Sequence, residues 1–203
     1  MINVLGLMSG TSCDGLDCCD AQIELDENYN FNWKINKFQT IDYTTEEKAF
    51  LLSTRNSNNN KGTEEKKVTR IFVDKINQFN YDISKFDLIS CHGHTVRHID
   101  KVMSKQFLDA SILFNEYKTP IAYNFRKKDI ELGGNGAPLM PFLDYLLFSE
   151  NKKNIITLNI GGISNITYLP SSCKKHLVSG FDTGPGMSLV DKSVEILFND
   201  LID

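Results

Sequence analysis

The sequence lacks the features that mark several large classes of protein. It has no block of basic residues, since 22 Lys and Arg stand against 26 Asp and Glu for a net charge of −4, so a nucleic-acid partner is not expected. No apolar run approaches the about 20 residues that cross a membrane. No basic leader or small-residue cleavage site follows Met1. We expect a soluble cytoplasmic protein with no membrane or nucleic-acid partner.

The cysteines lack the spacing of a disulfide framework or a structural zinc site. No two of the five form a C-x-x-C pair, and two are adjacent, which suits neither arrangement. They are Cys13, Cys18, Cys19, Cys91 and Cys173. The chain also has no G-x-x-x-x-G-K-[ST] loop, so a nucleotide site of that type is absent. Reduced thiols in a cytosolic protein are expected.

The chain does contain enough apolar material for a core. Its 203 residues are 41% hydrophobic and 10% aromatic, which is sufficient for one large or two small domains. Apolar and alternating segments predict strands at 2–8, 19–25 and 31–43. A helix is predicted to follow from Thr44, because its hydroxyl suits a helix N-terminus.

The middle of the chain predicts alternating helices and strands. A polar linker at 56–62 precedes apolar residues at helical spacing from Val68 to Phe79. Further helices are predicted at 107–117 and 137–148, and strands at 86–91 and 120–125.

The opening pattern then returns. Strands are predicted at 155–160, 163–169 and 177–181, followed by an amphipathic helix whose apolar face includes Val190 and Leu201. Two copies of a mixed α/β layer, each beginning with a Gly/Ser-rich hairpin, would face each other across a cleft. We therefore expect a first domain at 1–136 and a second, incomplete domain at 137–203.

Two hairpin turns could hold phosphate. In the turn at 9–17, glycines allow close approach of the backbone, amides and hydroxyls can donate to phosphate oxygens, and Asp14 and Asp17 could hold Mg²⁺ or its waters. The turn at Gly161 and Gly162 occupies the matching place in the second copy. The alternative for both is an ordinary hairpin turn, since Gly, Ser and Asp are common in any turn.

Asp182 is predicted to end a buried strand and to precede a glycine-rich segment. A carboxylate at a strand end faces the crevice in which α/β proteins bind ligands, where it can serve as a general base on water or a hydroxyl. The alternative is that Asp182 or Thr183 caps the following turn.

Two further segments could contact an anionic or sugar ligand. The histidine-rich segment 92–98 follows a predicted strand and is interpreted as a ligand-facing loop with Thr95 and Arg97. A zinc site of His92, His94 and His98 is the alternative. Arg126 follows another predicted strand and is well placed for paired hydrogen bonds to an anion, although its segment could equally be a solvated loop.

Six segments, in this order, resemble the anhydro-N-acetylmuramic acid kinases and span nearly the whole chain. They are Gly-Leu-Met-Ser-Gly-Thr-Ser-x-Asp-Gly-x-Asp at 6–17, His-Gly-x-Thr-Val-Arg-His at 92–98, Phe-Arg-x-x-Asp-Ile at 125–130, Gly-Gly-x-Gly-Ala-Pro-Leu at 133–139, Leu-Asn-Ile-Gly-Gly-Ile-x-Asn at 158–165 and Gly-Phe-Asp-Thr-Gly-Pro-Gly at 180–186. The resemblance implies an α/β, actin-like (ribonuclease H-like) fold of two domains. It also implies a reaction of peptidoglycan recycling.

In that reaction, water opens the 1,6-anhydro ring of the sugar while the freed 6-oxygen takes the γ-phosphate of ATP. The products are N-acetylmuramic acid 6-phosphate and ADP, and Mg²⁺ accompanies the nucleotide. The resemblance makes Asp182 the base that activates the water, and Thr95 and Arg126 contacts of the sugar. The ATP-binding residues it implies are Gly10, Thr11, Ser12, Cys13, Asp14, Gly15, Leu16, Asp17, Gly161 and Gly162. The residues that hold Mg²⁺ are left unassigned.

Three departures from the family pattern bear on these expectations. His94 stands where the family commonly has glutamine, and Met187 where it commonly has asparagine, so contacts near both are in question. Family members also continue well past residue 203. We therefore expect a truncated form that binds ATP poorly and turns over little, or one that a homodimer or a complementing C-terminal chain completes.

Two other functions stay open at this point. A non-catalytic sugar-binding or regulatory protein could keep the sugar-facing domain without nucleotide chemistry. A zinc hydrolase could use the three histidines of segment 92–98.

Overall fold

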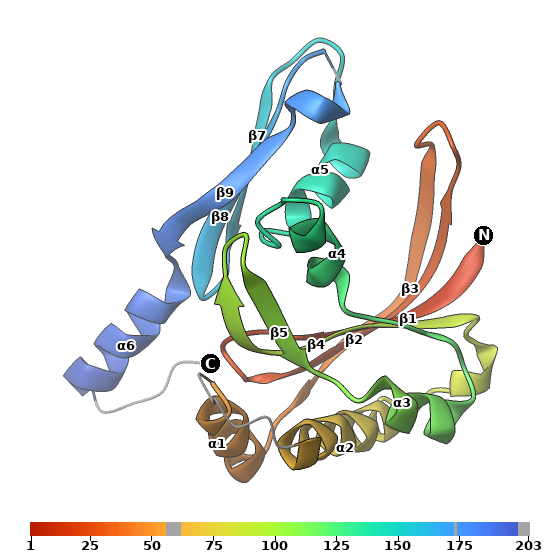
Figure 1. Cartoon of the computed structure of the whole chain (residues 1–203), viewed down its shortest axis with the longest axis vertical. Helices are drawn as coiled ribbons and strands as arrows, with labels where there is room; N and C mark the ends of the chain where they lie inside the picture. The colour runs from red at the N-terminus through yellow and green to blue at the C-terminus, as the bar shows by residue number, and fades with distance from the viewer. Residues whose placement is uncertain (56–61, 173, 199–203) are drawn as a thin grey trace. The chain divides into compact units, whose positions relative to one another are not determined.

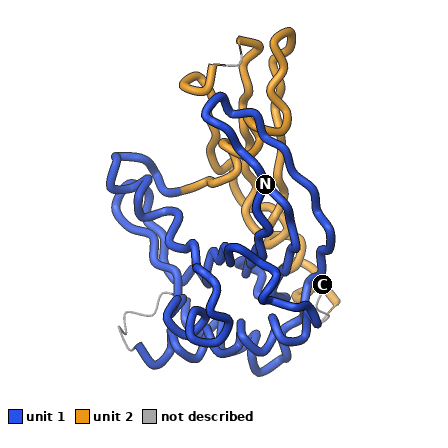
Figure 2. Tube along the Cα trace, turned by 90° about the vertical axis from the view of Figure 1, so that its right-hand side faces the viewer, with its two compact units in different colours: residues 1–136 blue, residues 137–203 orange. Residues whose placement is uncertain are grey.

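A computed structural model describes residues 1–55, 62–172 and 174–198. The chain divides into two compact units, residues 1–136 and residues 137–203, shown in blue and orange in Figure 2. We refer to them as the first and the second unit. Residues 56–61 of the predicted linker lie outside the described residues. The fold class α/β is confirmed, because each unit combines a sheet with helices.

The first unit is built on a mixed sheet with the strand order β3-β2-β1-β4-β5 (Figure 1). Its strands are β1 (Ile2–Ser9), β2 (Gly15–Leu25), β3 (Phe31–Asp42), β4 (Leu88–Ile99) and β5 (Met103–Phe107). Neighbours are antiparallel except β1 and β4, which are parallel. A short strand, β6 (Ile121–Ala122), also pairs with β4 in parallel. Strand β1 is therefore paired on both sides.

The described part of the first unit has four helices, and three of them cover one face of this sheet. The four are α1 (Thr45–Ser53), α2 (Gly62–Gln78), α3 (Ala110–Tyr117) and α4 (Phe125–Glu131), with a 3-10 turn η1 (Ile83–Lys85). Helices α1, α2 and α3 lie along the sheet in Figure 1 and share its hydrophobic core. From α2, Val68, Phe72 and Ile76 are buried, as predicted. Each such side chain contributes about 1.5–3 kcal/mol by leaving water.

Helix α1 begins where the sequence predicts. The Thr44 hydroxyl accepts a hydrogen bond from the Glu47 amide (3.2 Å), and the Glu47 carboxylate accepts one from the Thr44 amide (2.8 Å). This reciprocal capping box satisfies two amides that the helix itself leaves without partners.

Three predictions for the first unit are wrong. The strand predicted at 120–125 is only Ile121–Ala122, and Arg126 lies in helix α4, which begins at Phe125, and not in a loop directly after a strand. Residues 92–98 form the second half of strand β4 and not a loop, because β5 pairs with them in antiparallel register. The register between β1 and β4 shifts between Cys91 and His94. Gly93 lies at this shift with φ +78°, a conformation that glycine adopts readily. The helix predicted from 107 begins at Ala110, since residues up to Phe107 belong to β5.

The second unit repeats the opening pattern, as predicted. Strands β7 (Ile155–Ile160), β8 (Ile163–Leu169) and β9 (Ser179–Pro185) form an antiparallel sheet in that order, and helix α6 (Met187–Phe198) follows. Helix α5 (Met140–Phe148) precedes the sheet, and a 3-10 turn η2 (Lys175–Leu177) precedes β9. Strands β7 and β8 have the predicted bounds. No helix of the described ranges is long and apolar enough to cross a membrane.

A buried carboxylate ties α5 to the sheet of the second unit. Asp144 is 5% exposed, and its Oδ2 accepts hydrogen bonds from the hydroxyls of Thr157 on β7 (2.7 Å) and Thr167 on β8 (2.6 Å). Thr167 is itself buried. The carboxylate therefore satisfies two hydroxyls that would otherwise lack partners.

We predict that Asp144→Ala destabilises the second unit by about 2–3 kcal/mol, because it leaves a buried hydroxyl unpaired and removes two charge-assisted bonds. The chain's single tryptophan, Trp33, lies in the first unit, so hydrogen exchange of β7 and β8 amides is the suitable measurement. Glu195→Ala, which removes an exposed partner of Lys192, should change exchange little. Unaltered protection in Asp144→Ala would contradict this account.

Candidate functional site

The turn between β1 and β2 presents hydroxyls at the surface of the first unit. The Cys13 amide donates to the Gly10 carbonyl (3.3 Å), which closes the turn, and Cys13 adopts φ +57°. Thr11, Ser12 and Asp14 are exposed and Gly10 is half-buried. The other predicted ATP-binding residues of this segment, namely Cys13, Gly15, Leu16 and Asp17, are buried or half-buried. The exposed members are those that can reach a phosphate chain.

Contacts from α1 and β3 fix the turn. The Asp14 carbonyl accepts from the Tyr43 amide (2.8 Å), and its carboxylate forms an ion pair with Lys48 (2.6 Å). Burial raises the pKa of Asp14, but hydrogen bonds from Lys48 and Ser12 outweigh that effect and lower it overall. A Cβ at Gly15 would lie 2.7 Å from the Ile41 carbonyl oxygen. Only glycine permits that close approach of β2 to β3.

The two acids of this segment do not form a metal site together. Asp17 accepts a hydrogen bond from the Thr40 hydroxyl (2.6 Å), whereas Asp14 pairs with Lys48. Across the described ranges, no group of three or more His, Cys, Asp and Glu side chains could hold a metal ion. These residues do not form a preformed Mg²⁺ site.

In the second unit, the Gly161–Gly162 turn is joined to the start of α6. The Gly162 carbonyl accepts from the Gly186 amide (2.9 Å) and from the Ser188 hydroxyl (2.7 Å), and the Gly161 carbonyl accepts from the Met187 amide (2.8 Å). A Cβ at Gly186 would lie 2.3 Å from the Gly161 oxygen. The segment after β9 is therefore held directly against the turn.

Asp182 lies within β9 and not at its end, which corrects the sequence prediction. Strand pairing with β8 continues to Pro185, beyond the predicted limit. Asp182 faces Asn165, and the register then shifts so that Thr183 forms a bulge, with its hydroxyl donating to the Ser164 carbonyl (3.1 Å). Bulges re-aim neighbouring side chains. The Asp182 carboxylate is exposed and has no hydrogen-bond or ion-pair partner among the described residues.

Thr95 and Arg126 lie in the first unit, and their partners line one hollow. The Gln106 amide donates to the Thr95 hydroxyl (3.4 Å), and the Arg126 Nε–H donates to His92 Nε2 (3.0 Å). A hollow of about 270 Å³ is lined by both partners. Its complete lining is Glu65, His92, Ser104, Lys105, Gln106, Leu108, Tyr123, Asn124 and Lys127. Polar and cationic side chains predominate there.

The three histidines of β4 each bind protein groups. His92 contacts the Gly93 carbonyl (3.0 Å) and Arg126, His94 Nε2 contacts the Leu51 carbonyl (3.2 Å), and His98 contacts Asp100 (3.0 Å). Burial, with the Arg126 charge, lowers the pKa of His92 to about 4. Burial likewise lowers the pKa of His94 to about 4, to which the Arg55 charge contributes. These partners give the zinc-hydrolase interpretation no support.

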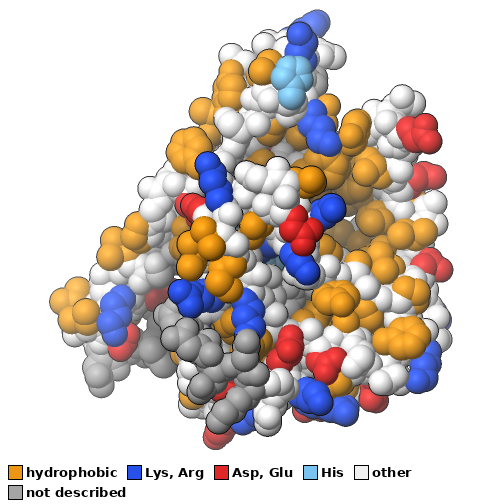
Figure 3. All heavy atoms as spheres, in the orientation of Figure 1, with side chains coloured by type: hydrophobic (Ala, Val, Ile, Leu, Met, Phe, Trp, Pro, Cys, Tyr) orange, Lys and Arg blue, Asp and Glu red, His pale blue; other side chains and the backbone are white. Residues whose placement is uncertain are grey.

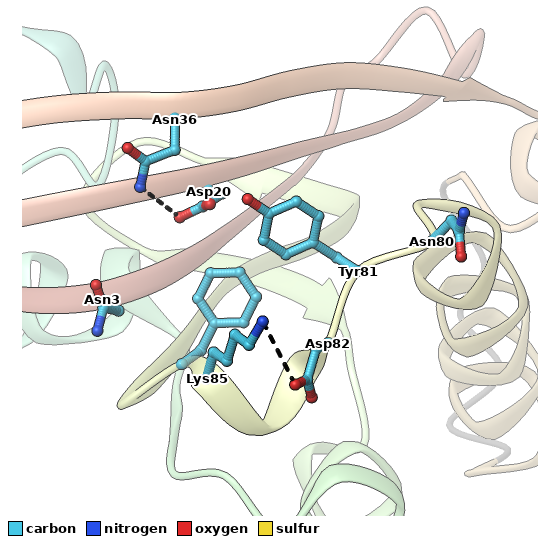
Figure 4. A pocket seen from close by; sticks show the side chains of 8 residues that line it. Asn3, Asp20, Asn36, Asn80, Tyr81, Asp82 and Lys85 are labelled. Carbon is cyan, nitrogen blue, oxygen red and sulfur yellow. Dashed lines mark hydrogen bonds and ion pairs between the residues drawn. The ribbon is translucent and has the colours of Figure 1, made fainter.

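Another hollow in the first unit contains none of the predicted site residues. Its volume is about 690 Å³, and its lining includes Asn3 near the start of β1 and Asp20 on β2 (Figure 4). The buried Asp20 carboxylate there accepts from Asn36 (3.2 Å), and Lys85 pairs with Asp82 (3.7 Å). A hydrogen bond to Asp20 raises the pKa of Tyr81. Asp20, Asn36, Asp82 and Lys85 are thus engaged with other residues that line this hollow.

Comparisons with known proteins decide the family. The family model described as anhydro-N-acetylmuramic acid kinase matches residues 2–202. This chain belongs to the anhydro-N-acetylmuramic acid kinase family. It is 34% identical to an anhydro-N-acetylmuramic acid kinase of Clostridioides difficile, over 96% of this chain and 54% of the relative. It is 35% identical to an anhydro-N-acetylmuramic acid kinase of Francisella tularensis subsp. novicida, over 96% of this chain and 55% of the relative. The chain spans about half the length of the curated relatives it matches.

Sequence reasoning missed several contacts that position the residues implied by the kinase family. The sequence around His92 indicates a metal ligand or a loop residue, whereas the bond from Arg126 to His92 spans 34 positions. Lys48, which pairs with Asp14, and Gln106, which contacts Thr95, were not identified either. No local pattern signals such pairs, because they depend on how β4, β5 and the helices pack.

Because His92 and His94 are buried with lowered pKa values, the stability of the first unit should depend on pH. Because their folded pKa of about 4 lies below the ordinary value of about 6.5, the unfolded chain takes up protons first as pH falls. The free energy of unfolding should therefore fall between about pH 6.5 and pH 4. His94→Gln, which keeps a polar side chain that cannot take up a proton, should reduce the loss between pH 7 and 5 by about 1–2 kcal/mol.

Urea denaturation followed by Trp33 fluorescence measures this difference. His176→Gln is the matched control, since His176 is exposed in the second unit, and it should leave the pH dependence as it is. An equal pH dependence in wild type and His94→Gln would show that His94 is not a neutral, buried group.

Proposed function

We propose that this protein is an ATP-dependent kinase that acts on 1,6-anhydro-N-acetylmuramic acid. In the proposed reaction, the oxygen of a water molecule bonds to C1 of the sugar as the bond between C1 and the 6-oxygen breaks. The 6-oxygen then bonds to the γ-phosphorus of ATP as the bond to the ADP oxygen breaks. The products are N-acetylmuramic acid 6-phosphate and ADP. Membership of the family over residues 2–202 is the observation that carries the proposal.

The β1–β2 turn is proposed to bind the phosphates of ATP. Thr11 and Ser12 offer exposed hydroxyls and backbone amides, and Gly10 has no side chain to obstruct a phosphate. Such donors neutralise phosphate charge without covalent chemistry, and phosphoryl transfer depends mainly on positioning and charge. Gly161 and Gly162 are proposed to serve the same ligand from the second unit.

Asp182 is proposed as the base that takes a proton from the attacking water. Its exposure and its lack of a protein partner among the described residues support this role, because a general base must have a lone pair available to the water. The neighbouring bulge at Thr183 holds the local backbone through the Ser164 carbonyl (3.1 Å).

Thr95 and Arg126 are proposed to contact the sugar. Arg126 suits the carboxylate that the sugar acid carries, because a guanidinium recognises a carboxylate by paired, charge-assisted bonds. The Thr95 hydroxyl accepts from Gln106 (3.4 Å), which directs its own proton towards another acceptor.

ATP is the proposed co-substrate, and Mg²⁺ is proposed to arrive with its phosphates. The described residues supply no preformed cluster of His, Cys, Asp and Glu for that ion. A cytoplasmic location is part of the proposal, since ATP is available there.

An actin-like arrangement with domains at 1–136 and 137–203 is also proposed. The repeated pattern of three antiparallel strands and a helix supports it. Within the described residues, β7 is paired on one side only, whereas its counterpart β1 is paired on both. Ile156, Leu158 and Ile160 on β7 are exposed. Figure 3 shows hydrophobic side chains at several places on the face of the molecule that it draws. Residues found in the longer relatives, a complementing chain or a second copy could complete this sheet.

We predict that Asp182→Asn lowers turnover by about 10²–10⁴-fold, the usual contribution of a general base, while ATP affinity is retained. Turnover is measured as sugar phosphate formed from ATP, Mg²⁺ and the anhydro sugar, using a chain extended to the length of the relatives. Asp191→Asn in α6 is the matched control and should retain activity. Full activity of Asp182→Asn would remove Asp182 from the mechanism.

A second prediction concerns length. The 203-residue chain should bind ATP poorly and turn over little, whereas the extended version should be active, and both can be assayed side by side. Robust turnover by the short chain would contradict the need for further residues. Absence of phosphorylated sugar with the extended chain would contradict the proposed function itself.

A further inference from the structure

Two hydrogen bonds hold the guanidinium of Arg126 in one plane. Arg126 is the second residue of α4, its Nε–H donates to His92 Nε2 (3.0 Å), and its Nη1–H donates to the Gly136 carbonyl (2.8 Å). The two acceptors come from different parts of the first unit, strand β4 and the loop after α4. A planar group bonded at two of its nitrogens keeps a defined orientation.

His92 can accept from Arg126 in only one protonation state. Its Nδ1 lies 3.0 Å from the Gly93 carbonyl oxygen, which only accepts, so Nδ1 carries the proton. Its Nε2 faces an Arg N–H, which only donates, so Nε2 must present a lone pair. The ring is 7% exposed, and burial with the Arg126 charge lowers the pKa of His92 to about 4. At neutral pH the ring is therefore neutral and has the required tautomer.

The second acceptor is fixed by its own loop. The Gly136 amide donates to the Asp129 carboxylate (2.7 Å), and the Gly134 amide donates to the Asp129 carbonyl (2.8 Å). Gly136 adopts φ +78°, and a Cβ there would lie 2.7 Å from the Ile130 side chain. Only glycine fits at this position, which fixes the direction of the carbonyl that Arg126 meets.

We propose that His92 is a positioning residue for substrate binding, which acts by holding the Arg126 guanidinium at the angle needed to pair with the carboxylate of the sugar acid. This inference rests on the proposed function, in which Arg126 contacts the sugar. His92 also lines the hollow of about 270 Å³, together with Asn124 and Lys127, which flank Arg126 in the sequence. The neutral imidazole of His92 supplies an acceptor without adding a charge that would compete with the substrate.

Substitutions at His92 separate this role from a packing role. His92→Phe fills a similar volume but cannot accept, and it should raise the KM for the sugar by about 10–100-fold, the cost of losing a bond to a charged partner, with little change in the KM for ATP. His92→Gln offers an amide oxygen as acceptor and should recover most of the loss. His176→Phe is the matched control on an exposed histidine. These kinetics use the chain extended to the relatives' length.

A double-mutant cycle tests the dependence on Arg126. If His92 acts through Arg126, then His92→Phe should have no further effect on the KM for the sugar in an Arg126→Ala background. Additive effects would overturn the inference. If Arg126→Ala leaves the KM for the sugar unchanged, the substrate role of Arg126 in the proposed function fails instead. The two failures are thus distinguishable.

The tautomer of His92 can be measured without an activity assay and without a variant. In ¹⁵N NMR spectra of the 203-residue chain at neutral pH, His92 should show a protonated Nδ1 and an unprotonated Nε2. A protonated Nε2, in either the other tautomer or the imidazolium, would overturn the inference, because Arg126 would then face a donor.

Discussion

The backbone ladder between β1 and β4 is the interaction on which the first unit depends. Because these strands are parallel, the ends of both point the same way, and Ser9 at the end of β1 pairs with His94 in β4. The β1–β2 turn and the polar half of β4 therefore emerge at the same end of the sheet. Without this pairing, the proposed phosphate-binding turn and the proposed sugar contacts would have no fixed relation within the unit.

Side chains beneath the turn reinforce that ladder. The Tyr43 hydroxyl donates to the Ser9 hydroxyl (3.1 Å), and an Arg55 nitrogen lies 3.4 Å from the Cys13 sulfur. His94 reaches the Leu51 carbonyl of α1 from the same side. Buried polar groups of this kind favour one packing arrangement. An arrangement that leaves them without hydrogen-bond partners would lower the free energy of unfolding. The turn thus rests on a polar layer as well as on the hydrophobic core.

Local chemistry explains which elements could be predicted from the sequence. The Gly161–Gly162 turn after an apolar run indicates the end of β7 and the start of β8, and Thr44 with Glu47 indicates the start of α1. Strand β5 was missed because only its pairing with β4 keeps both segments extended. The extension of β9 past Asp182 was missed for a similar reason, since the bulge at Thr183 exists only against β8. The bond between His92 and Arg126 depends on packing between β4 and α4, which no short motif records.

The bonds from Gly186, Met187 and Ser188 to the Gly161–Gly162 turn have a mechanical consequence. They connect the turn, the residue that follows β9 and the first residues of α6 by hydrogen bonds within the second unit. A displacement of the start of α6 would therefore have to break these bonds or move the turn with it. Because Gly186 directly follows β9, the same bonds also limit how far the end of the strand that carries Asp182 can move within this unit.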